Sequence, residues 1–278
     1  MAKYGMIIDV TKCTGCYSCF LSCRDEYAGN DYLPYSAAQP PSGQHWMQLK
    51  EKERGTCPKV KLDYIPTPCM HCGDASCITA ATGDAVYRRP DGIVIIDPAK
   101  AKGQKDIVSG CPYRVIYWNE EQHIPQKCTM CAHLLDQGWK EPRCVEACPT
   151  GALVFGDLDD PKSDISILKA SQGVEALHPE YKLNPAVMYI GLPKRFIAGE
   201  VVLSDQPDEC AEGIDVTLSF GDNKITVQTD NFGDFEFDGL ENDAPYTIEI
   251  AQGGYATKTF DVRTKIDVNL GTIVLEKQ

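Results

Sequence analysis

The cysteines are the residues of this 278-residue chain with the clearest chemical potential, because thirteen of the fourteen lie between Cys13 and Cys148. Most of them stand a few positions apart, a spacing that places thiolates around zinc or around an iron–sulfur cluster. Disulfides are the alternative, but they form in oxidising compartments, and the N-terminal stretch MAKYGMIIDV has no long apolar signal segment. The spacing therefore predicts bound metal.

The cysteines fall into four runs, which we compare with the ferredoxin pattern C-x-x-C-x-x-C-x-x-x-C-P. The first run is complete, with Arg24 in place of the proline, and consists of Cys13, Cys16, Cys19 and Cys23. The second run lacks its fourth cysteine and consists of Cys69, Cys72 and Cys77. The third run keeps only Cys111, which Pro112 follows. The fourth run has twelve residues between its second and third cysteines and consists of Cys128, Cys131, Cys144 and Cys148.

A crossing rule explains why Cys111 is retained: in two-cluster ferredoxins the last cysteine of each run binds the cluster of the other run. We pair run one with run four and run two with run three. The first quartet is then Cys13, Cys16, Cys19 and Cys148. The second quartet is Cys23, Cys128, Cys131 and Cys144, and the third quartet is Cys69, Cys72, Cys77 and Cys111. These sets predict three 4Fe–4S clusters, with Cys57 and Cys210 left as ordinary free cysteines.

The fourth ligand set is missing as a whole. The positions that would supply it hold Ala81, Ala101, Gln104 and Ile107. Random loss of four cysteines would seldom select one coherent set, so the pattern favours the deliberate absence of one cluster. Zinc is the alternative for run four, because its four thiolates would suffice for one tetrahedral ion. It leaves the triplets of the first two runs and the Cys111-Pro112 pair unexplained.

Several residues next to the cysteines have two interpretations. Lys12 and Lys127 either place positive charge beside an anionic cluster and raise its potential, or are ordinary solvated lysines. His71 and His133 are interpreted as groups that support the ligands or as surface residues. The apolar residues expected to surround the clusters and limit water are Tyr17, Phe20, Ile78, Val115 and Ile116.

The sequence predicts an α+β fold. Around the cysteines, strands are expected at 5–10, 92–97 and 151–158, and short helices at 20–29 and 132–138. They suggest a duplicated ferredoxin-like iron–sulfur domain. From residue 199 onward, seven stretches alternate apolar and polar residues between turn sequences such as DNFGD and ENDAP. The predicted domains are a ferredoxin-type domain at 1–158, a connecting segment at 159–197, and an all-β prealbumin- or immunoglobulin-like sandwich of seven strands at 198–278.

Charge is unevenly distributed along the chain. The net charge is −13, and residues 199–278 hold 17 acidic and 5 basic residues, so the cysteine-rich part is nearly balanced. Neither part has the basic footprint of a nucleic-acid-binding protein. No run of about 18 apolar residues is present, so no membrane-spanning helix is expected. Together with the missing signal segment, this predicts a cytoplasmic protein without a nucleic-acid partner.

The order of the four runs, together with the stretches PTPCMHC, DGIVIIDPAK and QKCTMCAHLL, resembles the iron–sulfur subunits of molybdopterin oxidoreductases of the dimethyl sulfoxide reductase family. The resemblance covers about residues 3–157. It implies two pseudo-symmetric ferredoxin units and a non-catalytic role in electron transfer. It also implies a large catalytic partner, in a heterodimer, that carries a bis-pterin molybdenum cofactor.

A narrower resemblance covers nearly the whole chain. The stretches HWMQLKEKERGT and YWNEEQHIPQKCTMCAHLLD, the absent fourth cluster and the C-terminal β region are similar to the small subunits of transhydroxylases that act on pyrogallol and phloroglucinol. This resemblance implies a polyhydroxylated aromatic substrate for the large partner. The alternatives are a subunit of a related catechol dehydroxylase, a subunit of a respiratory-type molybdopterin reductase, and, from another class, a structural zinc-binding scaffold.

Overall fold

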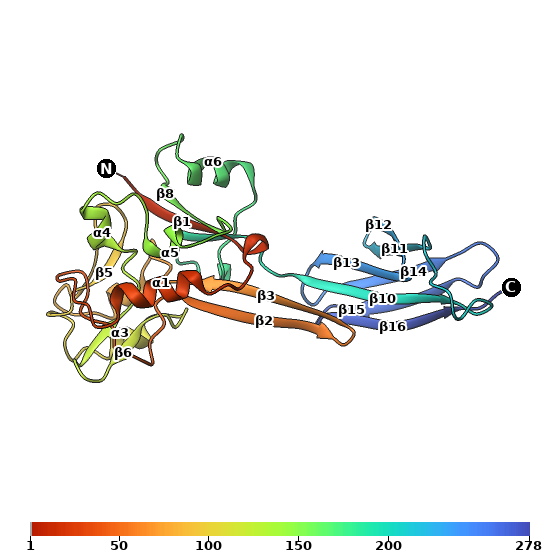
Figure 1. The fold of residues 1–278 in the computed structure, drawn as a ribbon, viewed down its shortest axis with the longest axis horizontal. Coiled ribbons are helices and arrows are strands. Elements are labelled where there is room, and N and C mark those ends of the chain that lie inside the picture. The colour runs from red at the N-terminus through yellow and green to blue at the C-terminus, as the bar shows by residue number, and fades with distance from the viewer. Residues whose placement is uncertain (1) are drawn as a thin grey trace. The chain divides into compact units, whose positions relative to one another are not determined.

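The computed structural model describes residues 2–278, which form two compact units. The first unit contains the chain up to Glu51 and Tyr64–Leu192, and the second contains Lys52–Asp63 and Pro193–Gln278. The chain therefore contributes to the second unit twice: once through the tip of a hairpin and once through its C-terminal part (Figure 1). The sequence analysis did not anticipate the share of the hairpin.

A small sheet organises the first unit. Its central strand β1 (Tyr4–Asp9) pairs antiparallel with β8 (Leu153–Asp157) and parallel with β9 (Val187–Ile190). Because side chains alternate along a strand, Met6 and Ile8 enter the core that holds the cysteines, whereas Ile7 packs against Ile165 of α6 (Asp164–Ser171). Both faces of β1 are thus covered, and its end leads directly into Cys13.

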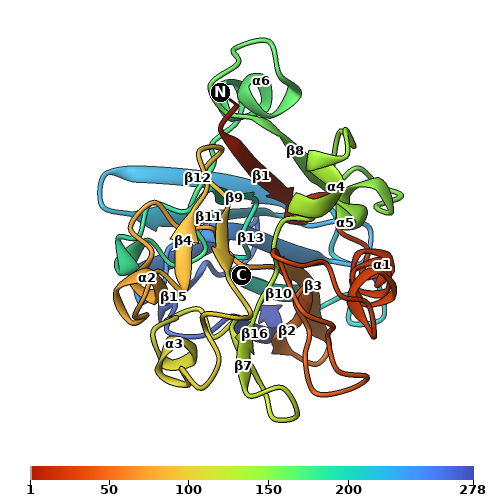
Figure 2. The ribbon, with the colours of Figure 1, turned by 90° about the vertical axis from the view of Figure 1, so that its left-hand side faces the viewer.

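The cysteine loops lie between short elements, which Figure 2 shows with α1, α4 and α5 on one side and α2 and α3 on the other. The helices are α1 (Ser18–Tyr27), α2 (Ser76–Thr79), α3 (Asp106–Ser109), α4 (Ala132–Asp136) and α5 (Arg143–Glu146). Two hairpins accompany them: β4 (Val86–Arg88) with β5 (Val94–Ile96), and β6 (Tyr117–Asn119) with β7 (Ile124–Gln126). The 3-10 turns are η1 (Val10–Lys12) and η2 (Pro179–Tyr181). Helix α1 packs against α5 and α2 against α3, which are the partners that the crossing rule requires. No helix within residues 2–278 is long and apolar enough to cross a bilayer.

The second unit is rich in β structure. One sheet has the strand order β13-β10-β16, and the other has the order β12-β11-β14-β15. The strands are β10 (Arg195–Leu203), β11 (Asp215–Phe220), β12 (Asn223–Gln228), β13 (Asp234–Leu240), β14 (Pro245–Ala251), β15 (Lys258–Arg263) and β16 (Val268–Leu275). A strand is found at each alternating stretch of the sequence, and the apolar positions of both sheets share one core, which includes Ile197, Leu218 and Phe237. The relation to prealbumin-like modules stays a prediction.

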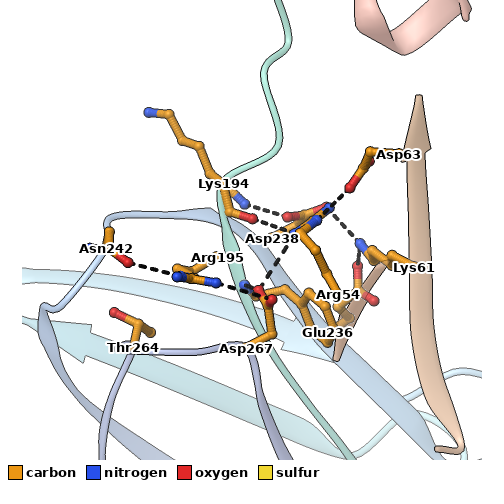
Figure 3. A network of polar contacts seen from close by, with 12 residues as sticks. Arg54, Lys61, Asp63, Lys194, Arg195, Glu236, Asp238, Asn242, Thr264 and Asp267 are labelled. Carbon is orange, nitrogen blue, oxygen red and sulfur yellow. Dashed lines mark hydrogen bonds and ion pairs between the residues drawn. The ribbon is translucent and has the colours of Figure 1, made fainter. Parts of the chain in front are cut away.

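The hairpin β2 (Gln48–Thr56) with β3 (Lys59–Thr67) was missed by the sequence analysis. The residues of β2, QLKEKERGT, are mostly charged and lack apolar alternation, whereas β3 alternates polar and apolar residues from Lys59 to Tyr64, a signal that could have identified it. The chain turns at Cys57 and Pro58, and Gly55, just before this turn in β2, has a φ of +83° and a position where a Cβ would lie 2.2 Å from the carbonyl oxygen of Lys59. Only glycine fits such a position. Ion pairs within the second unit (Figure 3) and packing against the buried ring of Phe196 hold the tip of this hairpin in place.

Candidate metal centres

The first quartet is assembled at the end of the central sheet. Cys13 follows η1, Cys16 and Cys19 surround the start of α1, and Cys148 lies between α5 and β8. Burial and the charges of neighbouring thiolates, Cys148 among them, raise the pKa of Cys13, and the same causes raise that of Cys19 to about 12. Burial opposes ionisation of Cys148, but the backbone N–H of Leu153 and the Thr150 hydroxyl lower its pKa. The thiols of the predicted quartet therefore lie close enough to influence one another.

The second quartet lies deepest in the first unit. Cys23 comes from α1, Cys128 follows β7, Cys131 begins α4 and Cys144 lies on α5. Burial and the charges of Cys128 and Cys131 raise the pKa of Cys23 well above its ordinary value. These four thiols line an apolar hollow together with Met6, Tyr27 and Met47. The site is thus largely shielded from water.

The third quartet combines the second and third runs. Cys77 lies on α2, Cys111 follows α3, and Cys69 and Cys72 precede α2. Burial and the charges of the other thiols of the set raise the pKa of Cys72 to about 12. All four line one hollow, and the hollow also contains Val115 and Ile116, which were predicted to surround a cluster. The retained Cys111 therefore lies with the cysteines of run two.

The three quartets are arranged in sequence through the interior, with the second in the middle. Burial raises the pKa of Cys144 in the second quartet, and the charge of Cys19, from the first quartet, adds to this rise. The charge of Cys69, from the third, acts on Cys128 of the second, and Cys69 lines the hollows of both sets. The effect of one charge on another falls off with distance, so the second quartet lies near both the first and the third.

The loops at three of the runs share one backbone geometry. Gly15, His71 and Met130 each stand two positions after the first cysteine of their run and have φ angles of 68°, 43° and 55°. In each loop the N–H of this residue faces the sulfur of that first cysteine, at 3.5 Å for His71 to Cys69 and 3.3 Å for Met130 to Cys128. A left-handed residue at this point turns the chain tightly, which directs successive thiols toward one centre.

The grouping bears on the choice between iron–sulfur clusters and zinc. A zinc ion at run four would need Cys148 beside the other three cysteines of that run. Instead, burial and the charge of Cys148 raise the pKa values of Cys13 and Cys19, so Cys148 lies near the first quartet. Cys23 is the fourth cysteine near Cys128, Cys131 and Cys144. Within residues 2–278, no three His, Cys, Asp or Glu side chains converge as they would around a single ion. Thiolates at the corners of a cube stand farther apart than ligands of one ion. Twelve thiolates, most of them buried or half-buried, need more compensating positive charge than the one buried Lys127 gives, and several iron ions would supply it, so the residues present fit such clusters.

The position of the lost fourth cluster is occupied by side chains. Ala101 and Ile107 are fully buried in a core that also contains Cys77 and Val94. The Gln104 side chain accepts a hydrogen bond from the backbone N–H of Thr82 at 2.9 Å, and its amide nitrogen donates to the carbonyl oxygens of Thr82 and Lys100. The residues at these predicted positions therefore form a packed core.

This core gives a stability prediction. Replacing Ile107 by valine removes one buried methylene and is expected to lower the free energy of unfolding of the first unit by about 0.5–1.5 kcal/mol. Chemical denaturation followed by the visible absorbance of the clusters would measure the change. The exposed Ile167, substituted in the same way, is the control, and an equal effect at both positions would contradict a packed core around Ile107.

The residues flanking the cysteines differ in their environment. Lys127 is buried, and its ammonium group donates to the carbonyl oxygens of Val94 and Cys128. Its charge favours ionisation of Cys77 and Cys128 although burial keeps both pKa values raised, which supports the tuning interpretation for this lysine. Lys12, by contrast, is half exposed and pairs with Asp9 at 3.3 Å, which supports its interpretation as an ordinary solvated lysine.

Both histidines near the cysteines are buried, and each has a hydrogen-bond partner. Burial lowers the pKa of His71 well below its ordinary value, and its Nδ1 accepts the N–H of Val94 at 3.1 Å. His133 lies 2.9 Å from a carboxylate oxygen of Glu26 and stacks on Tyr32. Both therefore lie close to the cysteine loops rather than on the surface.

One residue that the sequence analysis missed is Tyr27. It lies one helical turn after Cys23 on α1, so it faces the second quartet, and its hydroxyl lies 2.8 Å from that of Thr129. Its phenol also hydrogen-bonds to Cys131, which favours the thiolate form of that residue although burial keeps the pKa of Cys131 raised. The i, i+4 spacing from a candidate ligand was the signal that could have identified it.

An ion pair holds the end of α4 and gives a pH-dependent prediction. Arg89 contacts Asp136 at 2.7 Å and Asp91 at 2.8 Å, and the Arg89 hydrogen bond lowers the pKa of Asp136. The stability from Asp136 is present above the ordinary aspartate pKa and is lost as the pH falls through the lowered value. The denaturation midpoint of Arg89→Gln should therefore fall below that of the unsubstituted protein at neutral pH, and the difference should shrink on acidification. A difference that grows toward low pH would contradict this assignment.

Comparison with known proteins places these features in context. The protein family described as the 4Fe–4S dicluster domain matches residues 60–158. The chain is 41% identical to the pyrogallol hydroxytransferase small subunit of Pelobacter acidigallici, over 99% of this chain and 100% of that protein. It is 34% identical to a sulfite dehydrogenase subunit of Allochromatium vinosum, over 70% of this chain and 85% of that protein. It is 31% identical to the arsenate respiratory reductase iron–sulfur subunit of a Shewanella species, over 68% of this chain and 96% of that protein.

Proposed function

The chain belongs to the iron–sulfur subunits of molybdopterin oxidoreductases, and we propose that it carries three 4Fe–4S clusters for a large subunit that acts on polyhydroxylated aromatics. Within this family the chain is an electron-transfer subunit, and catalysis takes place in the large subunit. The observation that carries the aromatic substrate is the full-length identity to the hydroxytransferase subunit, since that similarity extends through the second unit, whereas the sulfite and arsenate relatives match 70% and 68% of the chain.

The three quartets are the proposed ligand sets. When bound, a cluster of this type accepts and releases one electron. The thiolates hold it, and Met6, Tyr27 and Met47 exclude water from the second site. Lys127 places a buried positive charge near the third and second sites. The chain's own contribution is thus position, low water content and electrostatic tuning.

The remaining proposals concern the assembly. The large partner is proposed to hold a bis-pterin molybdenum cofactor and to form a heterodimer with this chain. A cytoplasmic location is also proposed. The predicted domains at 1–158 and 198–278 are retained as functional divisions, with a prealbumin- or immunoglobulin-like sandwich that stabilises or docks the complex.

The test is an anaerobic assay of the purified complex with pyrogallol, followed by chromatography of the trihydroxybenzenes formed. Conversion to phloroglucinol, with about twelve irons in this chain, is the expected result. Loss of a hydroxyl group from catechol without isomer formation would instead indicate a dehydroxylase. Activity with inorganic acceptors alone, in a complex that contains a membrane subunit, would indicate a respiratory reductase. A colourless zinc protein would remove both the cluster assignment and the electron-transfer role.

A further inference from the structure

Two buried side chains that line the hollow of the third quartet each have a polar atom without a partner. His71 and Tyr113 line this hollow together with all four thiols of the quartet. The Nε2 atom of His71 and the hydroxyl oxygen of Tyr113 are buried and have no hydrogen-bond partner among residues 2–278. Of the five buried side-chain atoms in this state within the described part of the chain, none belongs to a residue that lines the hollow of the second quartet. Unpartnered polar atoms therefore gather at one candidate metal centre and not at its neighbour.

A hydrogen bond to the backbone fixes which ring nitrogen of His71 carries the proton. Its Nδ1 accepts the N–H of Val94 at 3.1 Å, so Nδ1 has no proton and the proton is on Nε2. The residue is 1% exposed, and its own backbone N–H faces the Cys69 sulfur at 3.5 Å, so the ring is enclosed beside the quartet. A buried N–H without an acceptor is unfavourable, and the sulfur atoms of a cluster would supply the acceptor.

The Tyr113 hydroxyl approaches the same hollow from the third run. Tyr113 follows Cys111 and Pro112 and is 5% exposed, and the ring of Tyr181 packs edge-on against its ring at 5.2 Å between centroids. Burial raises the pKa of Tyr113 to about 12, and the charges of Cys72 and Cys111 add to this rise, so the hydroxyl lies near both thiols. A tyrosine hydroxyl keeps its proton at neutral pH, so Tyr113 is a second donor beside this quartet.

These two donors bear on the reduction potential of a cluster held by the third quartet. Hydrogen bonds to the sulfur atoms of a cluster raise its potential, because the reduced form carries one more negative charge and gains more from each donor. Resting on the cluster proposed above for this quartet, we propose that His71 and Tyr113 donate hydrogen bonds to that cluster and raise its reduction potential. Lys127 cannot separate the third site from the second, because its charge favours the ionised form of both Cys77 and Cys128. The two neutral donors line the hollow of the third site and not that of the second, so they set one potential independently of the other.

The test is a redox titration of the purified anaerobic complex, followed by electron paramagnetic resonance, in which reduced dye mediators give one electron to each cluster. The signal that Cys111→Ala removes identifies the third cluster. Tyr113→Phe removes only the hydroxyl, and at a fixed potential it should lower the ratio of reduced to oxidised third cluster about tenfold, which is about 59 mV for a one-electron couple. Tyr181→Phe is the control, because it removes a hydroxyl from the neighbouring ring, which does not line the hollow. It should change this ratio less than about twofold.

The histidine is tested with two amides of different reach. His71→Asn keeps a short polar group for the N–H of Val94 and tolerates the φ of 43° at this position, but its amide does not extend to the place of Nε2. The ratio of reduced to oxidised third cluster should therefore again fall about tenfold. His71→Gln carries an amide N–H farther out and should restore most of the loss. In deuterated buffer, electron–nuclear double resonance of the third cluster should show one exchangeable coupling fewer in Tyr113→Phe and in His71→Asn.

Iron analysis separates this inference from the cluster assignment itself. About twelve irons in every variant, with unshifted potentials in both Tyr113→Phe and His71→Asn, would overturn the role of the two donors and leave the cluster in place. An unsubstituted complex without iron at the third quartet would overturn the cluster assignment, and the inference with it. Tyr113→Phe, the smaller change, decides the case by itself if His71→Asn lowers the iron content.

Discussion

Replacement of Cys111 by alanine is expected to lower the iron content of the chain from about twelve atoms to between about eight and eleven. The third quartet would keep three thiolates, so its cluster would be lost or would persist in a three-iron form. The structure places Cys111 in the hollow lined by Cys69, Cys72 and Cys77. Iron analysis and electron paramagnetic resonance of the anaerobic complex would measure the change.

Cys57 provides the matched control for this substitution. It is exposed, lies at the tip of the β2–β3 hairpin and belongs to no quartet, so Cys57→Ala should retain the full iron content. Full iron and an unchanged spectrum in Cys111→Ala would show that the retained cysteine is free, and the crossing rule would then not apply to this chain. A fourth cluster near Ala101 and Ile107 would contradict the assignment just as directly.

Replacement of Arg54 by methionine is expected to destabilise the second unit by about 3 kcal/mol, because the buried carboxylate of Asp267 loses one of its two arginines and keeps only Arg195. The Arg54 side chain is 4% exposed and lies 3.5 Å from Asp267, which is equally buried, and it also pairs with Asp63 (Figure 3). Its guanidinium donates as well to the carbonyl oxygen of Lys194. Scanning calorimetry should show the transition of this unit lowered by roughly 10 °C or more.

The control is Arg263→Met, which removes an arginine from a surface pair with Asp243. Both partners are solvent-exposed, so no measurable shift in the calorimetric transition is expected. Similar transitions for the two variants would show that the hairpin contributes no stability through Arg54. Unchanged iron content in both variants would confirm that the cysteine loops are not affected.

The cysteine sets could be predicted from sequence because cluster stoichiometry restricts the choices severely. Four ligands per cluster and the crossing rule leave one division of twelve cysteines, and the structure brings those sets together. Their binding of iron stays a prediction. The fourth set could be read as lost, but the sequence did not show that Gln104 would be fixed by hydrogen bonds to Thr82, since that requires the fold of α3 against α2.

The sequence analysis missed several strands, each for its own physical reason. The hairpin β2–β3 is stabilised by pairs such as Lys59 with Asp234, which are 175 residues apart, so the local pattern of β2 does not reveal its partners. The strands β4, β6 and β7 have three residues each, too few for a period to be detected, whereas β5 lies within the strand predicted at 92–97. Strand β9 lies inside the segment that was interpreted as a connection. The strands β10 to β16 are longer and alternate, and these were visible from the sequence.

The division of the second unit between Lys52–Asp63 and Pro193–Gln278 affects how the chain is made. During synthesis the hairpin tip leaves the ribosome well before its partners, and at roughly 5–20 residues per second the wait is on the order of ten seconds or more. Over this interval Arg54, Lys59 and Lys61 must stay solvated, which their charges allow. A strongly apolar tip would have been exposed to aggregation during translation, so the polar character that concealed the hairpin in the sequence also protects the nascent chain.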